Sequence, residues 1–276
     1  MAVPFLTLSD GNTIPQLGFG VFKVEPELTQ GVVEEALAAG YRHIDTATGY
    51  HNEEAVGKAI RASGIPRESL FVTTKLSNVD HKSGDIRGAY ERSLAWLDID
   101  YIDLYLIHWP MPAQEKYLGA WEKLIEFKSE GLTKSIGVSN FQVSQLQHII
   151  EATGVAPVVD QVELHPLFQQ KELLTYLDTK DVTVETWGPL GQGRWDLSAY
   201  PALTDAAIAH RKTPAQVILR WHIQTGHITI PKTTHRERMD ENIDIFDFEL
   251  NADEMKAIAA LDTGKRLGGN PDDVNG

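Results

Sequence analysis

Short apolar strand patterns alternate with helix patterns along almost the whole chain. After an initial hairpin, about eight runs of roughly four to six residues read as strands separated by helices. Alternation of this kind predicts parallel βαβ units, and eight such units close into a barrel. Barrels of this type typically need about 250 residues, and the chain has 276. We therefore predict one α/β domain spanning 1–276, a (β/α)8 TIM barrel.

The two ends of the chain carry different signals. The runs VPFLTL, SDGN and TIPQLGFG read as an N-terminal β-hairpin, because Asp10 and Gly11 form a strong turn signal, and we assign the hairpin to 1–16. The tail, 263–276, is Gly-rich and polar, which predicts a flexible segment.

A doubly wound open sheet is the alternative fold. That fold usually carries G-x-G-x-x-G after its first strand. The spacing is absent here, and the nearest glycine cluster, 188–193, follows a late strand and contains a proline. The barrel is therefore the preferred prediction.

Several helix boundaries can be predicted locally. Asn52 is placed to cap a helix that ends near Ser63, with acidic Glu53 and Glu54 in its first turn. Val32, Val33, Ala36 and Leu37 form the inward face of an earlier helix. Further helix patterns fall near 83–97, 114–130, 142–151, 170–179, 201–210 and 214–224.

Charge and composition exclude several classes of function. The net charge of −14 disfavours binding to nucleic acid or to anionic membranes, which depends on excess Lys and Arg. The absence of cysteine excludes disulfides, thiolate nucleophiles and iron–sulfur clusters. The N-terminus lacks a signal-peptide pattern, and no run reaches the roughly 18 apolar residues of a membrane span. We expect a cytoplasmic protein.

Four polar side chains stand at or just beyond the ends of strand-like runs. The runs are 41–45, 46–50, 70–75 and 101–108, and they end in Asp45, Tyr50, Lys75 and His108. In a parallel barrel such residues converge on the face that carries the chemistry. An Asp, a Tyr, a Lys and a His together indicate proton transfer at a carbonyl group.

Each of these four residues has a physical role in carbonyl reduction. A tyrosine hydroxyl can donate the proton, but an unperturbed tyrosine titrates near about pH 10. A neighbouring Lys75 ammonium is expected to lower the pKa of Tyr50, with Asp45 holding the lysine in place. His108 is expected to orient the carbonyl oxygen through a hydrogen bond.

Other interpretations of the same residues stay open at this point. Asp45 and Lys75 could form a structural ion pair, and His108 could be a satisfied core histidine. Lys75 could also attack a carbonyl and form a Schiff base, as in aldolases. A metallohydrolase is disfavoured, because the histidines show no H-x-H or H-E-x-x-H spacing.

Longer motifs carry a resemblance to a known family. They include GYRHIDTATGYHNEEAVGKAI, TTKL, DLYLIHWP, GLTKSIGVSNF, QVELHP, WGPLGQG and IPKTTHRERMDEN, in that order. From about Val3 to Asp262 the chain resembles the aldo-keto reductase superfamily, and most of all its bacterial 2,5-diketo-D-gluconic acid reductase branch. The catalytic tetrad of that family falls on Asp45, Tyr50, Lys75 and His108.

The resemblance implies NADPH bound in extended form, with Tyr50 as the general acid. The implied cofactor contacts are Ser139, Asn140 and Gln161 for the carboxamide, Trp187 for the nicotinamide ring, Gly188, Leu190, Gln192 and Gly193 for the pyrophosphate, Lys232, Thr233 and Arg238 for the 2′-phosphate, and Glu241 and Asn242 for the adenine. The last cluster could instead be a solvated helix start. The implied substrate pocket contains Phe22 and Trp109, and tail residues are expected to contribute.

Three positions depart from the family pattern. Ser77 stands where the family commonly has a pocket tryptophan, which predicts a wider or more polar pocket. Asp160 stands where an asparagine is usual, and a carboxylate cannot donate the hydrogen bonds of an amide. His235 stands where the branch tends to carry arginine, which weakens one phosphate contact, although Lys232 and Arg238 favour NADPH over NADH.

The resemblance predicts an NADP-dependent oxidoreductase, a monomer without metal, that reduces aldehydes and ketones to alcohols. Candidate substrates are 2,5-diketo-D-gluconate, which would give 2-keto-L-gulonate, and other small carbonyls such as methylglyoxal. The alternative is a cofactor-binding sensor or regulatory protein with little turnover. We expect no nucleic-acid or membrane partner.

Overall fold

Eight parallel strands form the centre of the protein in a computed structural model that describes residues 3–275. Residues 1–2 and 276, the outermost parts of the predicted hairpin and tail, lie outside this range. The strands follow one another around the sheet in chain order. They are β3 (Phe19–Gly20), β4 (His43–Asp45), β5 (Phe71–Leu76), β6 (Ile102–Ile107), β7 (Thr133–Ser139), β8 (Val159–Glu163), β9 (Thr183–Trp187) and β10 (Ile228–Thr229).

Backbone contacts between the first and last strands close the sheet into a barrel. Leu17 forms a parallel bridge with Thr229, and the Gly18 N–H donates to the Thr229 carbonyl at 2.9 Å. The Gly20 N–H donates to the Pro231 carbonyl at 3.1 Å. The predicted (β/α)8 barrel is confirmed.

The first barrel strand differs from the sequence prediction. It is the two-residue strand β3, which the sequence pattern placed in the hairpin. The predicted strand-like run 46–50 is not a strand, because Thr48–Tyr50 form the 3-10 turn η1 instead. This turn carries Tyr50 beyond the barrel rim.

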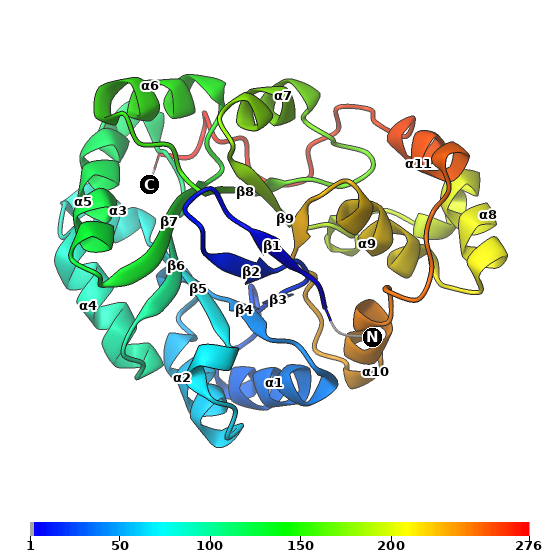
Figure 1. The fold of residues 1–276 in the computed structure, drawn as a ribbon, viewed down its shortest axis with the longest axis horizontal. Helices are drawn as coiled ribbons and strands as arrows, with labels where there is room; N and C mark the ends of the chain where they lie inside the picture. Colours follow the sequence, from blue (N-terminus) through cyan, green and yellow to red (C-terminus); the bar gives the residue numbers. More distant parts are fainter. Residues whose placement is uncertain (1–2, 276) are drawn as a thin grey trace.

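The predicted N-terminal hairpin lies across one end of the barrel (Figure 1). Its strands, β1 (Phe5–Thr7) and β2 (Thr13–Pro15), pair antiparallel, with Leu6 opposite Ile14. Ile14 is fully buried in a cluster that includes Leu104 and Val159 from the barrel strands. The hairpin therefore seals the N-terminal end of the barrel, which leaves the opposite end for a site.

The helices surround the barrel, as Figure 1 shows. Their bounds are α1 (Pro26–Ala39), α2 (Glu53–Ala62), α3 (Asn78–Ser83), α4 (Ile86–Leu97), α5 (Tyr117–Ser129), α6 (Val143–Thr153), α7 (Lys171–Thr179), α8 (Pro201–His210), α9 (Pro214–Gln224), α10 (Arg236–Ile243) and α11 (Ala252–Ala259). The pattern predicted near 83–97 is α4 alone. The short helix before it, α3, and the late helix α11 were not predicted.

Asn52 begins α2 as predicted, but its side chain does not cap the helix. The Asn52 amide accepts a hydrogen bond from Thr46 Oγ1 and donates to the Val21 carbonyl. It is 1% exposed, so these buried backbone and hydroxyl groups take its hydrogen bonds in place of the helix N-terminus. The residue thus ties the rim after β4 to the loop after β3.

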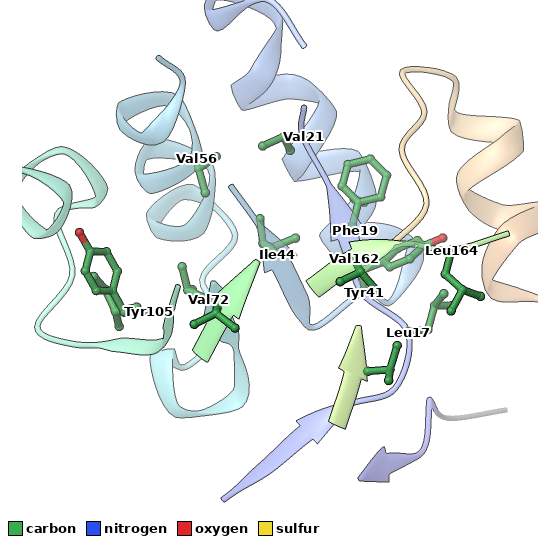
Figure 2. Close-up of a cluster of buried hydrophobic side chains, with 14 of the residues drawn as sticks. Leu17, Phe19, Val21, Tyr41, Ile44, Val56, Val72, Tyr105, Val162 and Leu164 are labelled. Carbon is green, nitrogen blue, oxygen red and sulfur yellow. The ribbon is translucent and has the colours of Figure 1, made fainter. Parts of the chain in front are cut away.

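Apolar side chains between the barrel strands and the surrounding helices form the main core, and Figure 2 shows part of it. Phe19 and Tyr41 meet edge to face with ring centroids 5.3 Å apart. The inward-facing residues predicted for the first helix, Val32, Val33, Ala36 and Leu37, all belong to this core. Burial on both faces explains why the strands read as near-continuous apolar runs.

Candidate active site

A cavity of about 900 Å³ opens at the C-terminal end of the barrel strands. Typical ligand pockets occupy roughly 300–1,000 Å³, so this one suits a large ligand. Residues from many separate loops line it, as expected for a barrel of this kind. Of the predicted site residues, the cavity is lined by Phe22, Asp45, Tyr50, His108, Trp109, Ser139, Asn140, Gln161, Trp187, Gly188, Leu190, Gln192, Gly193, Lys232, Thr233, Arg238, Glu241 and Asn242.

Lys75 is the one predicted site residue that lies behind the cavity wall. Its Nζ donates to both carboxylate oxygens of Asp45, at 2.7 and 2.8 Å, and to the Thr46 carbonyl at 2.9 Å. Burial alone would lower the pKa of Lys75, but the charges of Asp45, Tyr50 and Glu185 together raise it. A fully buried, protonated amine with all three N–H groups in use is a poor nucleophile. The geometry therefore disfavours a Schiff base.

Tyr50 projects from η1 into the cavity. The Lys75 ammonium lies 5.2 Å from the centroid of its ring. Burial raises the pKa of Tyr50 to about 12, and Asp45 and Glu185 add to this, while Lys75 lowers it. Lys75 thus lowers the pKa of Tyr50 as expected, but the net shift is upward, because desolvation outweighs the lysine charge. The phenol is protonated at neutral pH, as a proton donor must be.

His108 follows β6 and lies edge to face with Tyr50, with ring centroids 5.5 Å apart. Burial, together with the Lys75 charge, lowers the pKa of His108 to about 3. The imidazole is therefore neutral and has one N–H to donate. A carbonyl oxygen between Tyr50 and His108 could accept hydrogen bonds from both.

Three polar side chains and one indole form a connected wall beside this pair. Asn140 Nδ2 donates to the His108 carbonyl and to Ser139 Oγ, both at 3.0 Å. Asn140 Oδ1 accepts from Trp187 Nε1 at 2.8 Å. Gln161 comes from the neighbouring strand, where it pairs with Ser139. This wall has the amide groups needed to recognise a carboxamide.

The loop after β9 has the backbone shape of an anion site. Gly188, Gly191, Gln192 and Gly193 all have positive φ, between 54° and 70°. A Cβ atom at Gly191 would lie 1.9 Å from Trp195 Nε1, so glycine is required there. Successive backbone N–H groups in such conformations form concavities that bind phosphate oxygens.

Basic residues line the same cavity near the loop after β10 and the start of α10. They include the predicted Lys232 and Arg238, with His235 beside them, and Lys23 from the loop after β3. Burial, followed by the charge of Lys23, lowers the pKa of Lys232. This repulsion makes the pair a favourable place for an anion. The sequence analysis missed Lys23, because nothing local marks a lysine in the early loop as a neighbour of Lys232.

Ser77 does not line the cavity, in contrast to the expectation of a wider or more polar pocket at this position. Its Oγ accepts from the Asp80 N–H and donates to Asp80 Oδ2, so it caps α3.

Asp160, the second departure, is fully buried. Within the described residues neither of its carboxylate oxygens has a well-aligned hydrogen-bond partner, although the Phe141 backbone N–H lies near enough to interact. Burial raises the pKa of Asp160 well above its ordinary range, and the Phe141 backbone amide offsets this only in part. The expected difference in local hydrogen bonding is thus a buried carboxyl group with a raised pKa next to Gln161 on β8.

The C-terminal tail forms one side of the cavity through Gly268 and Gly269. Glu163, at the end of β8, accepts hydrogen bonds from the Leu267 N–H at 2.6 Å and the Gly268 N–H at 2.8 Å. A Cβ at Gly268 would lie 2.3 Å from the Trp187 ring. The tail therefore packs directly on Trp187, and Glu163 is an anchor that the sequence analysis did not single out.

Residues 3–275 contain neither a metal-binding cluster nor a membrane-spanning helix. No group of three or more His, Cys, Asp or Glu side chains within that range could hold a metal ion. No helix in the same range is long and apolar enough to cross a membrane.

Comparison with known proteins agrees with this geometry. The model of the aldo/keto reductase family matches residues 16–263. The chain belongs to this family. It is 49% identical over 271 residues to methylglyoxal reductase DkgA of Escherichia coli K12, covering 98% of each chain.

Solved structures of aldo/keto reductases have the same fold. An aldo/keto reductase from Brucella melitensis superposes with a TM-score of 0.90 at 50% identity, covering 95% of this chain and 100% of that one. A point mutant of Gox0644, crystallised in complex with NADPH, superposes with a TM-score of 0.94 at 44% identity, covering 99% of both chains. The predicted family and barrel are both confirmed.

Proposed function

We propose that this aldo/keto reductase uses NADPH to reduce small aldehydes and ketones to alcohols, with Tyr50 as the proton donor. The observation that carries the proposal is the cavity itself, where a protonated Tyr50 and a neutral His108 face the same space. Bound NADPH would supply the hydride. The Gox0644 complex shows that a relative of this fold binds that cofactor.

Residues of this chain fit the cofactor at each of its parts. The amides of Asn140 and Gln161 suit the carboxamide, and the positive-φ loop 188–193 suits the pyrophosphate. Lys232 and Arg238 suit the doubly charged 2′-phosphate. Trp187, Glu241 and Asn242 line the same cavity and would contact the rings, as the family resemblance implies.

The protein would move one proton in the reaction. The carbonyl oxygen lies between Tyr50 and His108, and His108 orients it with a hydrogen bond from its neutral imidazole. As the oxygen gains negative charge, Tyr50 gives up its phenolic proton, and the Lys75 ammonium stabilises the phenolate that forms. Asp45 keeps Lys75 charged and in place.

The aromatic walls favour small carbonyl substrates. Phe22, Trp109 and Trp187 line the pocket around the two polar donors. We place methylglyoxal first among candidates, because a relative that spans the same length carries that name, and 2,5-diketo-D-gluconate second. We also propose a cytoplasmic monomer, which cell fractionation and light scattering would test.

Fluorescence titration with NADPH and NADH, followed by loss of nicotinamide absorbance with a carbonyl panel, tests the proposal. Trp109, Trp187 and Trp195 line the cavity, so binding should quench tryptophan emission. Binding with turnover is the expected result. Tight binding without turnover on any carbonyl would indicate the sensor function instead.

A further inference from the structure

A second buried carboxylate lies beside the Asp45–Lys75 pair, and the proposed reaction gives it no role. Glu185, on β9, is fully buried, and its Oε2 accepts a hydrogen bond from Gln161 Nε2 at 2.9 Å. The same amide nitrogen donates to Asp45 Oδ2 at 2.7 Å. Gln161 and Glu185 are partners in the β8–β9 register, so the barrel itself sets this contact.

Two carboxylates on one amide nitrogen permit only one orientation of that amide. An amide has two N–H donors on nitrogen and only acceptors on oxygen. Turning the Gln161 amide over would place its oxygen against both acids, with no hydrogen bond to Asp45. Within residues 3–275 no hydrogen bond reaches Gln161 Oε1, and Gln161 lines the cavity. The atom of the Gln161 amide that is left to bind a ligand is therefore an acceptor.

The contact does not depend on the charge of Glu185. The charged or titratable groups that face it are Asp45, Lys75, Tyr50 and His43, whose Nε2 lies 3.6 Å from Glu185 Oε1. Burial lowers the pKa of His43 to about 3, so His43 is no counter-ion. Burial and Asp45 raise the pKa of Glu185. Ionised or protonated, Glu185 keeps an oxygen that accepts from Gln161.

We propose that Glu185 is a positioning residue that, with Asp45, locks the Gln161 amide so that Oε1 accepts a hydrogen bond from the –NH2 of the nicotinamide carboxamide. The inference rests on the proposed function. It makes the site selective for a cofactor that carries an N–H donor at this position. Such a lock is useful because a free glutamine amide could present either end to the ligand.

Replacing the carboxamide by a methyl ketone tests the lock. Reduced 3-acetylpyridine adenine dinucleotide phosphate lacks the –NH2 group, so it leaves Gln161 Oε1 without a partner. The wild-type protein should bind NADPH about tenfold more tightly than this analogue. Glu185→Leu should reduce the ratio of the two Kd values below about threefold, because one amide proton loses its acceptor.

Two variants separate positioning from general damage. Glu185→Gln retains a carbonyl oxygen for Gln161 and should keep the wild-type ratio. Thr186→Val, on the same strand, removes a buried hydroxyl that bonds to Thr229 and touches neither Gln161 nor Asp45, so it should also keep the ratio.

Three results would overturn the proposal. One is an undiminished ratio in Glu185→Leu, and another is a Glu185→Gln variant that behaves like Glu185→Leu. The third needs no variant: wild-type protein that binds both cofactors equally well. Wild-type protein that binds neither cofactor and reduces no carbonyl would instead refute the proposed function, and this inference with it.

Discussion

Lys75 and Asp45 form a buried ion pair, with Nζ 2.7 and 2.8 Å from the two carboxylate oxygens. The lysine is 0% exposed and the aspartate 2% exposed. Removing one partner of a buried pair leaves the other charge without compensation. The pair is thus a structural part of the barrel as well as the electrostatic support of Tyr50.

Lys75→Met should lower both stability and activity. We expect a loss of about 3–5 kcal/mol in the free energy of unfolding, because Asp45 stays buried and unpaired. Guanidinium denaturation measures this loss. Reduction should slow by at least about 10²-fold, since the phenolate of Tyr50 loses its neighbouring positive charge. The double variant Asp45→Asn/Lys75→Met should recover stability without activity; a double variant no more stable than Lys75→Met would contradict the ion-pair explanation.

Tyr50→Phe should reduce kcat by about 10²- to 10⁴-fold, because it removes only the proton donor. The Kd for NADPH should stay close to the wild-type value. Fluorescence titration and steady-state kinetics measure the two quantities on the same sample. Substantial turnover by this variant would shift the acid role to His108.

The pH dependence of wild-type reduction follows from the pKa of Tyr50. An acid catalyst works while it is protonated, and the pKa of Tyr50 is raised to about 12. The kcat for reduction should therefore stay level from about pH 6 to about pH 9 and fall only above that range. Alcohol oxidation needs the phenolate and should rise with pH. A reduction rate that halves near neutral pH would show that another group donates the proton.

Asp160→Asn should stabilise the protein at neutral pH by roughly 1–3 kcal/mol, because an amide avoids the cost of burying a carboxyl group that is ionised in the unfolded chain. The folded pKa of Asp160 is raised above its unfolded value of 3.8. Above that pH the unfolded state releases the proton and the folded state keeps it, so stability falls as pH rises.

The stability advantage of the Asp160→Asn variant over the wild type should thus grow from about pH 4 upward. Urea denaturation across that range checks it. Asp178→Asn, at an exposed position on α7, is the matched control and should change little. An Asp160→Asn benefit that is constant with pH would argue against a raised pKa of Asp160 in the folded protein.

Cofactor choice should depend on the basic end of the cavity. Lys232→Met or Arg238→Met should lower kcat/KM for NADPH by about 10- to 100-fold, the size of a lost charge-assisted contact, with little effect on NADH. Arg236→Met is the control, because Arg236 pairs with Asp240 on the outside of α10. Comparable kcat/KM values for NADPH and NADH in the wild type would refute the predicted preference.

Strand-end positions could be predicted from the sequence because they follow local patterns. Apolar runs such as 70–75 and 101–108 form the neighbouring strands β5 and β6, and the residues that end them meet at one rim of the barrel. The two-residue strand β3 could not be recognised, because two residues are too few to show a strand pattern. It is defined instead by its pairing with β4 and by the backbone hydrogen bonds that close the barrel.

Residues whose roles depend on distant partners were harder to predict. Asn52 has the sequence position of a helix cap, yet its amide nitrogen donates hydrogen bonds to buried carbonyls of the loop after β3. Glu185 and Glu163 lie within strand patterns and carry no local mark of function. Their partners, Gln161 and the tail, lie 24 and more than 100 residues away in sequence. The pKa of Tyr50 likewise depends on burial, which the sequence does not state.

Glu163→Gln should loosen the C-terminal tail. The Glu163 carboxylate holds the backbone N–H groups of both Leu267 and Gly268, and an amide at this position has only one oxygen to accept. Trypsin should then cleave after Lys265 or Arg266 several times faster than in the wild type. Because Gly268 packs on Trp187 beside the pocket, KM for the carbonyl should rise by roughly three- to tenfold, while the Kd for NADPH changes less.

Asp273→Asn is the matched control for this tail variant, because it alters an exposed tail carboxylate that, among residues 3–275, accepts a hydrogen bond only from Asn270. Its cleavage rate and KM should equal those of the wild type. Equal protease resistance of Glu163→Gln and wild type would show that the barrel holds the tail by other contacts, such as those of Thr263 with the Leu167 carbonyl. Faster cleavage with an unchanged KM would show that the tail is anchored by Glu163 but does not shape the substrate pocket.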